Sequence, residues 1–176
     1  MIVFIPGVII ATLTFPGVMV HELAHWLFCW LTRVKVREMC LFRFDTPQGY
    51  VLHESPSSPW KQILIAVGPA FVNTTVGFAL GLLLARVEHA SEYIQIAWGP
   101  LAWLAISVTM HAFPSTGDAK VIWCAVRSPS APLLARFVGT PIVGLIFLGA
   151  WGSVVWLNLI YAYLVTMVLP EKLGLA

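Results

Sequence analysis

Residues 2–31 read IVFIPGVIIATLTFPGVMVHELAHWLFCWL, an apolar run interrupted by His21-Glu22-Leu23-Ala24-His25. On a helix, residues four apart share a face one turn apart, so both imidazoles can reach a single metal ion. Zinc accepts neutral imidazole nitrogens, and the intervening glutamate is placed to take a proton from an activated water. The alternative is a polar cluster on an ordinary buried helix. Ionisable groups in hydrocarbon cost roughly 2.5–3.5 kcal/mol each, so three within five residues favour the metal site.

The composition is that of a membrane protein. The chain has 176 residues, of which 59% are hydrophobic and 10% are charged, whereas soluble domains carry about 25% charged residues. We expect a single domain over residues 1–176. A net charge of +2 without a basic tract argues against nucleic acid as a partner. The first apolar run has no basic flank, so we expect it to stay in the membrane rather than be removed.

Four apolar stretches are long enough to cross a bilayer, which takes about 20 residues as a helix. They run over about 2–31, 60–85, 94–113 and 137–169. Prolines at positions 6 and 16 are expected to kink or divide the first stretch. The sequence therefore predicts an all-α membrane protein of about four transmembrane helices.

The segment between the first two stretches, residues 34–54, is of a different kind. Residues 34–37 alternate apolar and basic side chains, residues 41–44 and Tyr50–His53 favour strands, and residues 45–49 are typical of a turn. Non-helical backbone at membrane depth is tolerated only when protein or a water cavity satisfies it. We therefore predict a membrane-associated β-hairpin at the interface.

The basic residues predict the orientation of the chain. With four spans, the loops after the first and third share one side, which would carry eight of the ten lysines and arginines. These are Arg33, Lys35, Arg37, Arg43, Lys61, Lys120, Arg127 and Arg136. Positive charge favours the cytoplasmic side, so we expect both termini outside and the histidine motif nearer the cytoplasmic face.

A catalytic zinc needs a third protein ligand, which leaves one position open for water. Asp118 is the best candidate, because it follows the third stretch on the same predicted side as the histidines, after a break rich in proline, serine and glycine. It is also suited to stabilising the N-terminus of the helix that it opens. The two interpretations are compatible.

Three motifs occur in a characteristic order. They are His21-Glu22-x-x-His25, then Gly68-Pro69-Ala70-Phe71-Val72-Asn73, then Pro114 to Asp118. With the hairpin between the first two, this order resembles the site-2 protease family of intramembrane zinc metalloproteases over about residues 16–126. Two departures from the family pattern are His111 in place of asparagine and Ala119 in place of glycine after Asp118.

The resemblance implies one Zn²⁺ per chain, bound by His21, His25 and Asp118, with Glu22 as the general base. It also implies that Asn73 lies beside the zinc and holds the substrate backbone or the developing oxyanion. From the residues alone, Asn73 is equally open to a bridging hydrogen bond between helices. His111 has three interpretations: a ligand, a donor to a ligand, or a polar group near the site.

The expected function is hydrolysis of peptide bonds in membrane-spanning substrates near the cytoplasmic face. The expected partners are the bilayer and a membrane protein or peptide substrate, for which the resemblance implies single-span regulators or signal-peptide remnants in a prokaryotic-type cell membrane. One alternative is a metal-binding pseudoprotease that binds a membrane partner without cleaving it. A transporter is a further alternative, which the lack of an internal repeat disfavours.

Overall fold

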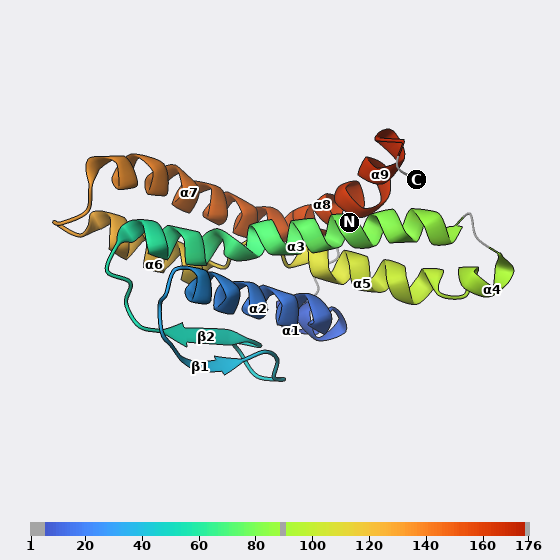
Figure 1. Ribbon diagram of the computed structural model, residues 1–176, viewed down its shortest axis with the longest axis horizontal. Helices are drawn as coiled ribbons and strands as arrows, with labels where there is room; N and C mark the ends of the chain where they lie inside the picture. Colours follow the sequence, from blue (N-terminus) through green and yellow to red (C-terminus); the bar gives the residue numbers. More distant parts are fainter. Residues whose placement is uncertain (1–5, 89–90, 175–176) are drawn as a thin grey trace.

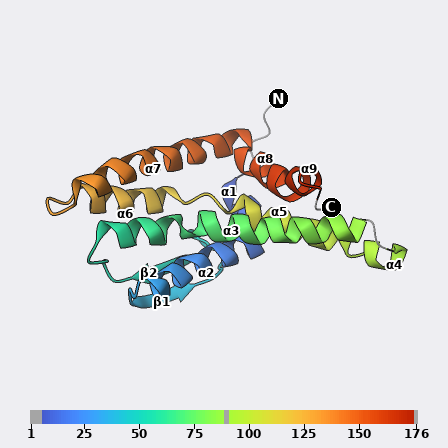
Figure 2. The same cartoon turned by 45° about the horizontal axis from the view of Figure 1, so that its top comes forward.

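The structure is a computed structural model that describes residues 6–88 and 91–174, and it is mostly helical. Figure 1 shows the long helix α3 running through the molecule, with α2 and the hairpin on one side of it. Figure 2 shows α6 and α7 on the opposite side of α3. The elements are α1 Gly7–Leu13, α2 Phe15–Leu31, β1 Val36–Cys40, β2 Tyr50–His53, α3 Pro59–Glu88, α4 Glu92–Gln95, α5 Trp98–Met110, α6 Thr116–Arg127, α7 Leu133–Gly152, the 3₁₀-helix η1 Ser153–Val155, α8 Leu157–Tyr163, the π-helix η2 Leu164–Val168 and α9 Leu169–Lys172.

Four transmembrane helices are not confirmed. In the part of the chain that the structure describes, two helices are long and apolar enough to span a membrane, Pro59–Val87 and Leu133–Val155. A third span exists only if α1 and α2, which are bent by 89°, are counted together. The predicted span over 94–113 contains α5, whose 13 residues reach only about 20 Å at 1.5 Å per residue.

The first and last predicted spans are both divided. In the first, Pro16 lacks the amide hydrogen that would continue the helix from α1, so the chain bends at Thr14 as the prolines predicted. Residues 2–5 of that span lie outside the described residues. In the last, α7 ends at Gly152, and Trp156 adopts a left-handed conformation with φ 63° before α8 begins.

The predicted hairpin is confirmed, with one strand displaced. β1 pairs antiparallel with β2, and Met39 lies opposite Val51. The prediction of a strand at residues 41–44 was wrong. There the backbone N–H and the Nε of Arg43 donate to the carbonyls of Gln48 and Pro47, each at 2.7 Å, so this segment closes the turn instead of extending a strand.

Close helix packing and one apolar cluster position the site. A Cβ added at Gly17 of α2 would lie 2.0 Å from the carbonyl oxygen of Ser107 on α5, so only glycine permits this approach. α6 is held against α3 and α7 by a buried cluster that includes Ala119, the neighbour of Asp118. Its members are Ile63, Ala66, Ala119, Ile122, Val126, Val143 and Ile146.

Candidate metal centre

The two histidines of the motif lie side by side on α2 and are buried. The Nε2 atoms of His21 and His25 are 3.2 Å apart. The two residues are 9% and 7% exposed, so water has little access to either ring. The regular helix over Phe15–Leu31 produces this arrangement, because a spacing of four places both rings on one face.

Asp118 reaches the same point from the first turn of α6. Its Oδ1 is 3.4 Å from Nε2 of His25, and one ligand atom from each of His21, His25 and Asp118 lies within 4.8 Å of the other two. The other oxygen, Oδ2, accepts hydrogen bonds from the backbone N–H and the hydroxyl of Ser115, both at 2.7 Å. Asp118 therefore caps its helix with one oxygen, as the sequence allowed, and places the other oxygen beside the histidines.

Backbone carbonyls fix the tautomer of both imidazoles. Nδ1 of His21 donates to the carbonyl of His111 at 2.7 Å, and Nδ1 of His25 donates to the carbonyl of Ile65 at 2.9 Å. A carbonyl only accepts, so each Nδ1 carries the hydrogen and each neutral ring has a lone pair on Nε2. Two lone pairs 3.2 Å apart repel unless a cation or a proton lies between them. Metal-binding histidines are commonly oriented by hydrogen bonds from Nδ1–H to a backbone carbonyl, as both are here.

The donor set fits zinc. Two imidazole nitrogens and one carboxylate oxygen make a three-ligand set of the catalytic kind, with one position left for water. Ligands at about 2.0–2.1 Å in a tetrahedron are roughly 3.3 Å apart, close to the 3.2 Å and 3.4 Å found here. The ligand roles themselves stay a prediction.

Glu22 lies beside this group on the side of α2 that faces the hairpin. It is 8% exposed, and a Cβ added at Gly49 would lie 2.6 Å from its Cγ. In the described part of the chain, the Glu22 carboxylate makes no hydrogen bond or ion pair. The carboxylate is therefore free to exchange a proton with a molecule that enters the site.

Asn73 is fully buried on α3, and its amide bridges three helices. Its Nδ2 donates to the carbonyls of Gly17 on α2, at 3.3 Å, and Val108 on α5, at 2.9 Å. This is the bridging arrangement that the sequence left open. To hold an oxyanion, an N–H of Asn73 would have to leave one of these two carbonyls. A role beside the scissile bond therefore stays a prediction.

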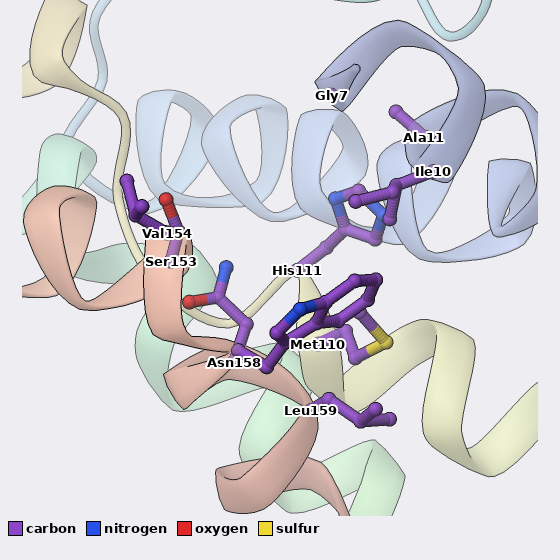
Figure 3. Close-up of a pocket in the computed structure, with 10 residues that line it drawn as sticks. Gly7, Ile10, Ala11, Met110, His111, Ser153, Val154, Asn158 and Leu159 are labelled. Atoms are coloured by element: carbon purple, nitrogen blue, oxygen red, sulfur yellow. The ribbon is translucent and has the colours of Figure 1, made fainter. Parts of the chain in front are cut away.

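His111 acts on the site through its backbone, and its ring lies elsewhere. The ring is not part of the three-residue group; its Nε2 is 2.8 Å from the hydroxyl of Thr14. Figure 3 shows it at a cavity of about 280 Å³ that Met110, Ser153 and Asn158 also line. The carbonyls of His111 and Ile65 are the site groups that the sequence analysis missed, because side-chain motifs do not report free carbonyls.

The chain matches a known protein family. The DUF3267 family, whose description is "Putative zincin peptidase", matches residues 14–133, about two thirds of the chain. The matched range includes His21, Glu22, His25 and Asp118. No curated protein and no solved structure matches the chain.

Proposed function

The chain belongs to the DUF3267 family of zincin-type peptidases, and we propose that it is an intramembrane zinc metallopeptidase of the site-2 protease type. The observation that carries the proposal is the group of His21, His25 and Asp118, whose ligand atoms lie within 4.8 Å of one another. The family supports a zinc peptidase. The two or three apolar helices around the buried site support its location within the membrane.

The chemistry follows from the donors. His21, His25 and Asp118 would hold the zinc ion, which when bound acts as a Lewis acid on water and on the scissile carbonyl. The Glu22 carboxylate takes the proton from the attacking water and delivers it to the leaving amine. Gly49 leaves the space next to Glu22 in which the carboxylate can make this exchange.

The substrate is a membrane-spanning segment of a protein or peptide. A helix keeps its amides in internal hydrogen bonds, so it must unwind locally before one can be cleaved. The edge of β2 that does not pair with β1 offers backbone groups to such an unwound segment by strand addition. β2 begins at Tyr50, directly after Gly49 and hence next to Glu22.

We assign the cytoplasmic side to the end of the molecule that carries the hairpin and the α6–α7 connection. Figure 1 shows the α6–α7 connection and the start of α3 at the left end, with the hairpin in the same half of the molecule. Of the ten lysines and arginines, eight belong to these segments and their neighbours, and the other two are Arg86 of α3 and Lys172 of α9. The positive-inside rule supports this orientation, with the site nearer the cytoplasm.

The test is the Glu22→Gln variant, which removes the base but no ligand. We expect it to bind zinc like the wild type while cleaving a single-span model substrate in proteoliposomes about 10²–10⁴-fold more slowly. If Glu22→Gln cleaves as fast as the wild type, the mechanism is wrong. A wild-type chain that binds zinc and substrate without cleavage would identify the pseudoprotease instead.

A further inference from the structure

The carbonyl that orients His25 belongs to a residue with an unusual place in its helix. Ile65 lies on α3, four residues before Pro69, which is inside the same helix. In an α-helix, each carbonyl accepts from the N–H four residues later. Proline has no N–H, so the usual partner of the Ile65 carbonyl does not exist. This is the carbonyl to which Nδ1 of His25 donates at 2.9 Å.

The surroundings of this bond leave little room for another donor. Ile65 is 1% exposed and Pro69 is also fully buried, so water cannot readily take the place of the imidazole. The neighbouring Gly68 brings the two helices together, because a Cβ there would lie 2.5 Å from Cδ2 of Phe28, three residues after His25 on α2. The His25 imidazole and the Ile65 carbonyl therefore satisfy each other in a dry contact between α2 and α3.

We propose that Pro69 is a positioning residue of the metal centre. By withholding the helical N–H, it reserves the Ile65 carbonyl for Nδ1–H of His25, which holds the imidazole in the tautomer whose Nε2 faces His21 and Asp118. The proposal rests on the metal centre of the proposed function and adds a residue outside the group of three ligands. An alanine at this position would supply an N–H that competes for the same carbonyl.

The experiment compares full-length variants in detergent. Pro69→Ala and Pro69→Gly both restore the N–H but have opposite helix propensities, so an effect that they share does not come from helix propensity. We expect both to bind zinc about 10–100-fold more weakly in competition with a chromogenic chelator, the range typical of lost partners behind a metal ligand. We also expect their Co²⁺-loaded forms to show altered visible absorption, which reports the coordination geometry.

Pro141→Ala is the matched control, because Pro141 also lies inside a helix, α7, and that helix contributes none of the three ligand atoms. Its zinc affinity should stay within about twofold of the wild type. Zinc affinities within twofold of the wild type in both Pro69 variants would overturn this inference and leave the proposed function intact. A wild-type chain that takes up no zinc would overturn both.

Discussion

At the scale of the residue, the candidate site combines what the sequence could reveal with what it could not. The spacing of His21 and His25 predicts a shared helix face, and the structure places Asp118 next to them. The orientation of the rings depends on the carbonyls of His111 and Ile65. These contacts join residues 90 and 40 positions apart, so only the packing of the helices produces them.

The ring of His111, the residue whose carbonyl accepts from His21, is hydrogen-bonded to the Thr14 hydroxyl. The Thr14 hydroxyl donates to the carbonyl of Ile10 at 2.7 Å, so it accepts from Nε2–H of His111. Thr14→Val removes this acceptor and leaves the imidazole, which borders a cavity, without its polar partner. We expect zinc affinity to fall by up to about tenfold, because the carbonyl behind His21 loses its anchor.

Thr14→Ser keeps the hydroxyl and should bind zinc like the wild type in the same chelator competition. Thr32→Val serves as a second control, since Thr32 makes a similar bond to the carbonyl four residues earlier on α2, at Phe28, with no histidine attached. Equal zinc affinities in Thr14→Val and Thr32→Val would contradict the anchoring role.

At the scale of the element, the sequence predicted the types of secondary structure better than the residues at which each helix or strand begins and ends. Alternation and turn residues predicted the hairpin, and Pro16 predicted the division between α1 and α2. Hydropathy could not show that the last apolar stretch is broken at Trp156, because it does not report backbone turns within an apolar run. The strand predicted at residues 41–44 failed because the hydrogen bonds of Arg43 to the turn outweighed local β-propensity.

The contact between the hairpin and α2 gives a prediction at this scale. Gly49→Ala would place a Cβ 2.6 Å from Cγ of Glu22, so the side chain of this proposed general base must shift. We expect cleavage to slow by at least about tenfold, because a misplaced base loses its reach to the reacting water. The zinc content should not change, since the atoms nearest to an added Cβ at Gly49 all belong to Glu22, which is not one of the three ligands.

Gly144→Ala on α7 is the matched substitution, because an added Cβ there meets nothing within 4 Å. It should cleave like the wild type in the same proteoliposome assay. Full activity in Gly49→Ala would show that the position of Glu22 beside the hairpin does not matter for turnover.

At the scale of the whole molecule, composition predicted an apolar helical protein, and the structure has two helices, or three with the bent pair, that could span a membrane. The count of four depended on length alone. The length of an apolar stretch does not show how much of it forms one helix. The stretch over 94–113 contains α5, a helix of only 13 residues, which packs against α2 and α3 beside the site.

Orientation can be tested by thiol labelling of intact cells. In a chain whose cysteines at positions 29, 40 and 124 are replaced by serine, Ser130→Cys lies in the α6–α7 connection and Ser91→Cys lies before α4. We expect a membrane-impermeant maleimide added outside to label Ser91→Cys only, because positive charge favours the cytoplasmic side for the basic end. Labelling confined to Ser130→Cys would reverse the orientation.

The central claim is that one zinc ion is bound by two histidines of α2 and the carboxylate of Asp118. The most direct measurement is the metal content per purified chain of the wild type and Asp118→Ala, with Asp45→Ala as an exposed control outside the site. We expect about one zinc per chain in the wild type and in the control, and a small fraction of that in Asp118→Ala. A full equivalent of zinc in Asp118→Ala, or none in the wild type, would contradict it.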